Sequence, residues 1–408
     1  MSRQFDIPTS YRSSELTAIK STSSLSNDER RSFKPIILDY LTVIFSIARH
    51  FGFCFGVNNA IEIAHRAIEE NPGRKIYLLG EMIHNPEVND DLLKRGVKFI
   101  SACCEQDLSM LSADDIVIAP AFGVTLELQE RLRRCGVVKS HYDTTCPFVR
   151  KVWKRARELG ASGFTVIVHG KRTHEETLAT FSHSQPAAPT LVIRDLADSK
   201  KITDFISGIL SKDEFLLHFK PSMSRNFDPD IHLRKIGVVN QTTMLANETK
   251  QITAALRQAY CDVFGEDKID EHFADTRDTL CYATNENQNA TKALIEHGAD
   301  IAIVVGGYNS SNTSHLAELC EQAVPTFYIR DASEILDAYT IRHFDVKNGS
   351  IVQSTNWLDY TPPVRIAITS GASCPDYLVE NVIKKILRFF EPSTAEQPLS
   401  TYIQGSIA

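Results

Sequence analysis

The segment Asp143–Trp153, DTTCPFVRKVW, places a thiol between an expected apolar strand and the first turn of an expected amphipathic helix. Pro147 suits the first helical position, where a backbone N–H has no acceptor inside the helix. Apolar side chains then recur at helical spacing, at Phe148, Val149, Val152, Trp153 and Ala156. We therefore expect Cys146 at the positive end of a helix dipole, where a thiolate is favoured and can bind a metal or attack a substrate.

Two other segments repeat this arrangement of strand, cysteine and helix. Val43–Ala64 contains GFCFGV, with Cys54 at the junction, and Phe273–Gly298 contains LCYATNENQNATKALIEHG, with Cys281 at the junction. Three separate elements thus each offer one thiol. The sequence has no CxxC pair, which disfavours zinc ribbons, thioredoxin-type motifs and the clustered cysteines of bacterial ferredoxins.

The order of elements predicts an α/β protein with mainly parallel sheets. Each third of the chain carries three strand–loop–helix units, and the first unit of each third begins with a cysteine. We expect three lobes, related by pseudo-threefold symmetry, around a central cavity that holds a metal cluster. The expected parts are a polar, poorly ordered N-terminal extension (1–36), three lobes (37–146, 147–280 and 281–390) and a polar tail (391–408), with a surface insertion near 195–235 in the second lobe.

Length and composition limit the classes of function. At 408 residues and 43% hydrophobic, the chain can bury a large core, and a net charge of −7 argues against binding to nucleic acid or to an anionic membrane. The apolar run Pro35–Ala48 contains Asp39 and is too short to span a bilayer, so we interpret it as a strand. The first residues lack a secretory signal, so a cytoplasmic bacterial protein is expected, with a plastid leader as the open alternative.

The nine cysteines indicate a reducing compartment and free or metal-bound thiols. Those expected to be buried and inert are Cys103, Cys104, Cys135, Cys261 and Cys320. Three thiolates at equivalent junctions suit a 4Fe-4S cluster with one iron left open, because structural zinc prefers four protein ligands. The alternative is three unrelated core cysteines.

Polar residues follow several of the other expected strands. In HGKRTHEET, His174 can bind an anion and Glu176 can transfer a proton, although acidic residues also cap helices without further function. His169, on the strand side, is interpreted as structural. The loops GGYNSSNTS, TSGASCPD, MIHN and NQTT combine glycines with hydroxyl, amide and imidazole groups at helix N-termini, which together favour a polyanionic ligand.

These motifs, taken in order from about Phe51 to about Ile386, resemble the 4-hydroxy-3-methylbut-2-enyl diphosphate reductase family. That family catalyses the last step of the non-mevalonate isoprenoid route. The matching stretches are GFCFGV, IHNPEVN, DTTCPFVRKVW, HGKRTHEET, NQTTM, CYAT, NSSNTSHL and TSGASCPD. PAFG and the middle insertion are more similar to the longer cyanobacterial and plastid form.

The resemblance implies a role for each matching position. The implied ligands of one 4Fe-4S cluster are Cys54, Cys146 and Cys281. The implied diphosphate ligands are His84, His174, Ser310, Ser311, Asn312 and Ser373. Glu176 resembles the acid that protonates the departing hydroxyl, and Thr242 the hydroxyl that orients substrate and relays the proton. The shorter bacterial form has a second substrate histidine where this chain has Phe122, so no anion contact is expected there.

The implied reaction reduces 4-hydroxy-3-methylbut-2-enyl diphosphate to isopentenyl and dimethylallyl diphosphate. It implies an external electron donor of the ferredoxin or flavodoxin kind. Two alternatives remain at this point: a dehydratase similar to quinolinate synthase, and a non-enzymatic iron–sulfur redox sensor that would need the cysteines but not Glu176.

Overall fold

The computed structural model describes residues 5–22, 32–101, 108–137, 142–274, 279–392, 395 and 397–402. The chain divides into two compact units. Unit 1 comprises Met1–Asn58, His84–Asn89 and Tyr282–Ala408, and unit 2 comprises Asn59–Ile83 and Asp90–Cys281. Cys103 and Cys104 lie outside the described residues, as do parts of the expected N-terminal extension and tail.

Unit 1 is built on a five-stranded sheet with the order β1-β2-β13-β9-β10. These strands are β1 (Ile36–Tyr40), β2 (Val43–Ile47), β13 (Val364–Ser370), β9 (Ile301–Val305) and β10 (Thr326–Ile329). Only the β1–β2 pair is antiparallel. The helices of this unit include α1 (Ser14–Thr22), α13 (Tyr282–Glu296), α14 (Ser311–Glu321) and α15 (Asp376–Phe390), and β11 (Thr340–Asp345) pairs with β12 (Ser350–Thr355) as a separate hairpin. The short 3-10 helices are η1 (Thr9–Tyr11), η5 (Ala332–Glu334) and η6 (Leu399–Tyr402).

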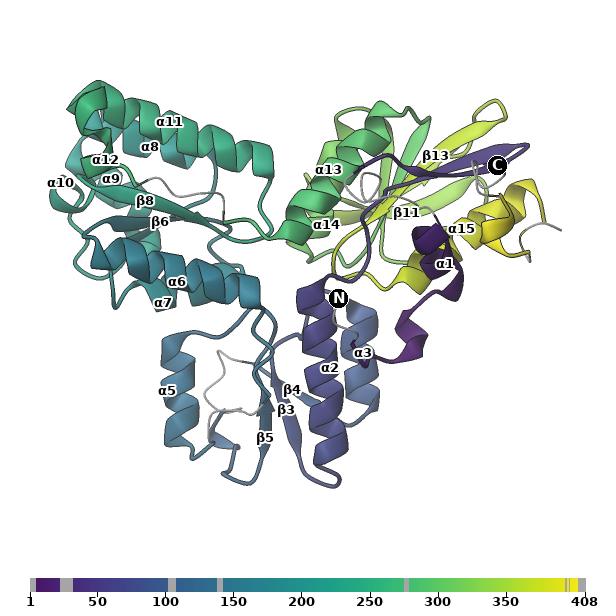
Figure 1. Ribbon diagram of the computed structural model, residues 1–408, viewed down its shortest axis with the longest axis horizontal. Coiled ribbons are helices and arrows are strands. Elements are labelled where there is room, and N and C mark those ends of the chain that lie inside the picture. Colours follow the sequence, from purple (N-terminus) through teal and green to yellow (C-terminus); the bar gives the residue numbers. More distant parts are fainter. Residues whose placement is uncertain are drawn as a thin grey trace. The chain divides into compact units, whose positions relative to one another are not determined.

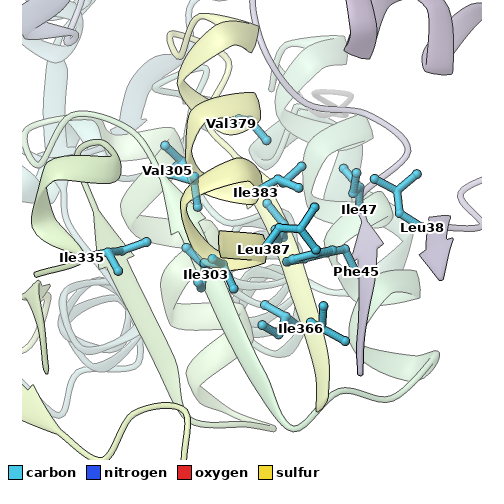
Figure 2. Packing of buried hydrophobic residues seen from close by; sticks show 14 of the residues in the cluster. Leu38, Phe45, Ile47, Ile303, Val305, Ile335, Ile366, Val379, Ile383 and Leu387 are labelled. Atoms are coloured by element: carbon cyan, nitrogen blue, oxygen red, sulfur yellow. The ribbon is translucent and has the colours of Figure 1, made fainter. Parts of the chain in front are cut away.

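Both faces of this sheet are covered, as a parallel sheet requires. Successive side chains of a strand point to opposite faces, so Ile303 and Val305 of β9 enter one core while Val304 enters another. Helix α15 covers the first face, and Figure 2 shows Val379 and Leu387 directed toward the strands there. Helices α13 and α14 cover the second.

Unit 2 contains two parallel three-stranded sheets, with the orders β4-β3-β5 and β7-β6-β8. Their strands are β3 (Ile76–Leu79), β4 (Lys98–Ile100), β5 (Ile116–Ile118), β6 (Thr165–His169), β7 (Thr190–Ile193) and β8 (Ile236–Asn240). The helices are α5 (Leu126–Arg134), α6 (Pro147–Ala161), α7 (Glu175–Ser184), α8 (Leu196–Ile206), α9 (Lys212–Phe219), α10 (Pro229–His232), α11 (Ala246–Phe264) and α12 (Ile269–His272), with η3 (Lys220–Ser222) and η4 (Glu266–Lys268). Helices α2 (Phe55–Glu70) and α3 (Pro86–Lys94) each contain residues of both units.

In the β7-β6-β8 sheet, alternate residues of a strand again enter different cores on the two faces. Val166 and Val168 of β6 pack in one core with residues of α6, and Ile167 packs in another core with residues of α8, α9 and α11. Figure 1 shows α6 and α7 on one side of β6 and β8, and α8 and α11 on the other. The prediction of an α/β protein with mainly parallel sheets is confirmed.

The grouping of the first strands differs from the prediction. The run Pro35–Ala48 forms two strands and not one, because Leu41 and Thr42 make a turn in which Leu41 is exposed. Strand β2 then pairs with β13, near the end of the chain, so residues 36–47 share a sheet with strands of the last third and not with β3 to β5. No Gly, Pro or Asn marks this turn, which explains why the sequence pattern did not reveal it.

The N-terminal extension was expected to be poorly ordered, and this expectation is wrong for residues 5–22. Helix α1 buries Leu16 and Ile19 completely in the core shared with α15. Such burial contributes about 2 kcal/mol for each side chain. Figure 1 shows α1 beside α15, and Lys20 forms an ion pair with Asp376.

The polar tail is also ordered over its described part. Leu399 is fully buried, and its backbone N–H donates to Glu15 Oε2 of α1 over 2.7 Å. The Tyr402 ring lies 4.3 Å from that of Tyr40, measured between centroids. A few apolar side chains therefore fix residues 5–22 and 397–402 on unit 1.

The segment near 195–235 was expected to be a surface elaboration. It forms α8, α9, η3 and α10, and it buries Ile202, Phe215 and Phe219 in the core that covers one face of β6. The segment is therefore a structural layer of unit 2. Among the described residues, no helix is long and apolar enough to cross a membrane.

Candidate functional site

The polar residues predicted for the site form one connected set in each unit. In unit 1 we call His84, Ser310, Ser311, Asn312 and Ser373 the donor set. In unit 2 we call Cys146, His174, Glu176, Thr242 and Cys281 the acid set. In the donor set, the serines and Asn312 follow the carboxyl ends of β9 and β13, and His84 lies between β3 and α3. In the acid set, Glu176 and Thr242 follow β6 and β8. Loops at these strand ends are where open α/β sheets bind ligands.

In the donor set, hydroxyl groups lie close together at the start of α14. Ser310 is the N-cap, and its Oγ accepts from Thr313 N over 3.3 Å. Ser373 Oγ lies 3.4 Å from Ser310 Oγ and 3.3 Å from the His84 carbonyl oxygen. All five members of the set are at most 9% exposed.

Asn312 is the member whose hydrogen bonding is incomplete. Its Oδ1 accepts from Ala372 N over 2.9 Å and from Asn287 Nδ2 over 3.4 Å. Its Nδ2 is buried and has no hydrogen-bond partner within the described part of the chain. Buried donors are normally paired, so this N–H group is suited to an acceptor on a bound ligand.

Glycines allow the loops of the donor set to approach each other. A Cβ at Gly307 would lie 2.5 Å from the His84 carbonyl oxygen, and one at Gly371 would lie 1.9 Å from Thr313 Oγ1. Any larger residue at either position would separate the β9–α14 loop from its neighbours. Cys54, directly before α2, is tied to the same region because its N–H donates to the Ala372 carbonyl over 3.2 Å.

In the acid set, Glu176 is held by both groups of one threonine. Thr242 N donates to Oε1 over 2.6 Å, and Thr242 Oγ1 lies 2.9 Å from Oε2. Glu176 is only 2% exposed. Burial raises the pKa of Glu176 to about 7, and the two Thr242 hydrogen bonds oppose this shift without cancelling it. The carboxyl group can therefore carry a proton near neutral pH.

His174 is the N-cap of α7, and its Nδ1 accepts from Glu176 N over 3.1 Å. A neutral imidazole that accepts at Nδ1 carries its proton on Nε2. The Phe122 ring meets the His174 ring edge to face, with centroids 5.5 Å apart. Phe122 thus contacts the histidine ring at the position where the resemblance implied no anion contact.

Cys146 is affected by the charge of Glu176, and Cys281 is hydrogen-bonded to Thr242, the partner of Glu176. Cys146 is the N-cap of α6 with Pro147 at the first helical position, as the sequence predicted. Burial raises the pKa of Cys146, and the N–H groups of Phe148 and Val149 lower it, while the Glu176 charge raises it further. The expected preference for thiolate is thus outweighed by burial in this structure. Cys281, directly before α13, donates its N–H to the Thr242 carbonyl over 3.2 Å.

The other described cysteines differ in their surroundings. Burial raises the pKa of Cys320 to about 12 and also raises that of Cys374, and both side chains are fully buried, as expected of inert thiols. Cys135 and Cys261 are half-buried, which is less than predicted. Cys54, Cys146 and Cys281 are half-buried, form no disulfide in the described structure, and each directly precedes a helix.

His169 is confirmed as a structural residue. It is fully buried, its Nδ1 lies 3.3 Å from both Asn240 Oδ1 and Thr249 Oγ1, and burial lowers its pKa to about 4. Sequence reasoning missed the support given by Gln241. Its Oε1 accepts from Lys171 N and from Thr177 Oγ1, each over 3.0 Å, which ties the loops before α7 and α11 together.

Comparison with known proteins decides the family. The family model described as LytB protein matches residues 45–387. The chain belongs to the LytB family. This LytB-family chain is 38% identical over 360 residues to the 4-hydroxy-3-methylbut-2-enyl diphosphate reductase of Prochlorococcus marinus strain NATL1A, a match that covers 87% of this chain and 88% of the relative. It is 39% identical over 353 residues to the reductase of Synechococcus sp. strain WH7803, with 85% of each covered.

Solved structures agree with the family fold. A structure described as (E)-4-hydroxy-3-methyl-but-2-enyl diphosphate reductase, the terminal enzyme of the non-mevalonate pathway, matches with a TM-score of 0.50 and 25% identity, covering 86% of this chain and all of that chain. The Plasmodium falciparum reductase matches in fold with a TM-score of 0.62 and 22% identity, covering 85% of this chain and 89% of that one. The resemblance expected from the motifs is confirmed.

Proposed function

We propose that this LytB-family chain reduces 4-hydroxy-3-methylbut-2-enyl diphosphate to isopentenyl diphosphate and dimethylallyl diphosphate. The relatives that share 37–39% identity over most of the chain carry the name of this reductase. The observation that carries the proposal is the buried Glu176 carboxyl, fixed by Thr242 in the same unit as Cys146 and Cys281. The overall reaction consumes two electrons and two protons and releases one water.

We assign one 4Fe-4S cluster to Cys54, Cys146 and Cys281, with one iron left open. The chemistry of these residues fits such a group, because they are thiols outside any disulfide of the described structure, each partly accessible and each directly before a helix. When bound, the cluster supplies electrons and a Lewis-acidic iron for the allylic oxygen. Three cysteine ligands would leave one iron of such a cluster without a protein ligand.

Glu176 acts as the proton donor. An allylic hydroxyl leaves poorly unless its oxygen is protonated, so a carboxyl with a pKa of about 7 is matched to this task at neutral pH. The Thr242 hydroxyl orients one carboxyl oxygen and its backbone N–H orients the other. Thr242 Oγ1 can also pass a proton to Glu176 Oε2, because a hydroxyl both donates and accepts.

The donor set binds the diphosphate. Its hydroxyls, the Asn312 amide and the N-terminus of α14 offer donors for phosphate oxygens without a buried cation. The unpaired Nδ2 of Asn312 is the clearest of these donors among the described residues. His174 adds an Nε2–H donor from the acid set. A ferredoxin or flavodoxin is the class of donor that fits delivery of single electrons.

The test is an anaerobic turnover assay. The protein is purified without oxygen, reduced with dithionite and methyl viologen, and given the allylic diphosphate, and the products are identified by nuclear magnetic resonance, which distinguishes the two isomers. We expect both isopentenyl and dimethylallyl diphosphate. A protein that has a complete 4Fe-4S cluster and leaves the substrate unconsumed would contradict the proposal.

A further inference from the structure

Helix α1 lies outside the part of the chain that the family model matches, residues 45–387, yet it contacts a loop that carries a proposed cluster ligand. Its buried Leu16 and Ile19 anchor it on unit 1 next to α15. Lys20, near the end of α1, then reaches two neighbouring segments at once.

The Lys20 ammonium group donates hydrogen bonds to three oxygen atoms. It donates to Asp376 Oδ1 over 3.0 Å and Oδ2 over 2.9 Å, and to the Phe51 carbonyl oxygen over 3.1 Å. It also lies 3.7 Å from the centroid of the Phe51 ring. The Lys20 side chain is 29% exposed and that of Asp376 is 18% exposed, so solvent screens this ion pair only partly.

The backbone of the loop before Cys54 fits closely against this ion pair. Gly52 has a φ of +82°, and a Cβ there would lie 2.0 Å from Asp376 Oδ1. Two residues later, Cys54 N donates to the Ala372 carbonyl. The loop 51–54 is therefore held at Phe51 by Lys20 and at Cys54 by the loop that contains Ser373.

Asp376 connects the same contact to the donor set. It is the first residue of α15, three residues after Ser373, where a carboxylate is favoured by the helix dipole. Lys20 thus joins the start of α15 to the loop that presents Cys54. Both ends of this bridge lie in unit 1.

We propose that Lys20 is a positioning residue that holds the loop 51–54 against the start of α15 and so fixes where Cys54 presents its thiol. The inference rests on the proposed function in that Cys54 is proposed to bind the cluster. The contacts of Lys20 with Phe51 and Asp376 are present without a cluster. Helix α1, which precedes the residues that the family model matches, then supports the site.

The experiment compares the alkylation rates of cysteines in the cluster-free, full-length protein. Lys20→Met removes the ammonium group and keeps an apolar stem, whereas Lys20→Arg can still pair with Asp376. Lys384→Met is the matched control, because Lys384 also binds α1, through Glu15 over 2.8 Å, and no contact of its ammonium group reaches residues 51–54 in the described structure. Iodoacetamide labelling is followed by mass spectrometry, with Cys146 as the internal reference.

We expect Lys20→Met to raise the labelling rate of Cys54 about five-fold relative to Cys146, the size that net loss of one typical hydrogen bond would produce. Lys20→Arg should restore most of the protection, and Lys384→Met should leave the ratio near that of the unmodified protein. In the iron-loaded protein, loss of absorbance near 410 nm to a chelator should accelerate in the same order of variants.

Equal Cys54 labelling ratios in Lys20→Met and Lys384→Met would overturn the inference. If Lys20→Met does not fold, Asp376→Asn replaces it, with the same expected increase and the same contradicting result. Failure of the proposed function is detected separately: a Cys54→Ser protein that keeps its whole cluster would refute the ligand assignment, whatever the Lys20 variants show in the cluster-free protein.

Discussion

The donor set contains hydroxyls, an amide and an imidazole, whereas the acid set contains a carboxyl, two thiols, an imidazole and one hydroxyl. In the donor set the hydrogen bonds link short side chains at the start of α14 and leave Asn312 Nδ2 unpaired among the described residues. In the acid set both oxygens of Glu176 are paired, and burial raises its pKa. One set is suited to holding an anion, and the other to moving a proton. Binding and chemistry are therefore expected to respond to different mutations.

The largest effect should come from the cysteines. Changing Cys54, Cys146 or Cys281 to Ser should remove the cluster absorbance near 410 nm and abolish turnover, because a serine hydroxyl is a poor ligand for iron at neutral pH. Cys135→Ser is the control, since Cys135 is half-buried in unit 2 and has no assigned role. Full iron content in all three serine variants would contradict the ligand assignment.

Glu176→Gln should separate chemistry from binding. Loss of the proton should lower kcat by about 10²- to 10⁴-fold, while KM changes little. The glutamine can still accept from Thr242 N, so the fold should persist. Steady-state kinetics with methyl viologen measures both constants, and unchanged kcat in a protein with an intact cluster would remove Glu176 from the mechanism.

The pKa of Glu176 also predicts a pH effect on stability in the cluster-free protein. The folded pKa is about 7 and the ordinary value is 4.5, so between these values the folded state binds more protons. The free energy of unfolding should therefore fall as pH rises through this window, by about 3 kcal/mol in all, and level off above about pH 7.

Glu176→Gln should remove that fall. The variant should resemble the unmodified protein in denaturant titrations near pH 4.5 and be more stable at pH 8. Identical stability of the two proteins at both pH values would show that burial does not raise this pKa.

The smallest expected effect concerns the donor set. Asn312→Ala removes one buried donor, so KM should rise about ten-fold with kcat nearly unchanged. Asn348→Ala, in the exposed turn between β11 and β12, is the control for a change of the same size in the same unit. A drop in melting temperature without a change in KM would show that Asn312 serves only the fold.

How far the sequence predicted these features depends on the range of the interactions. The junctions at Cys54, Cys146 and Glu176 were visible because strand, cap and helix signals lie within about ten residues. The Thr242–Glu176 pair joins residues 66 positions apart, and no local pattern reports such a contact.

The ends of the chain were misread for a related reason. Residues 1–36 are polar on average, and this composition does not predict burial. Leu16 and Ile19 are buried because they pack with α15, which lies far along the sequence. Leu399 likewise belongs to a segment that is polar on average. It is buried because its segment packs against α1 and β1. The role of Lys20 follows from these same long-range contacts, with Asp376 lying 356 positions away.

The electron paramagnetic resonance spectrum of the anaerobically purified, dithionite-reduced protein, recorded before and after the allylic diphosphate is added, tests both the cluster and its open iron. We expect a 4Fe-4S signal, with about four irons per chain, that changes shape when substrate reaches the open iron. A chain that binds no iron, or a cluster signal that substrate leaves unchanged at saturating concentration, would contradict this expectation.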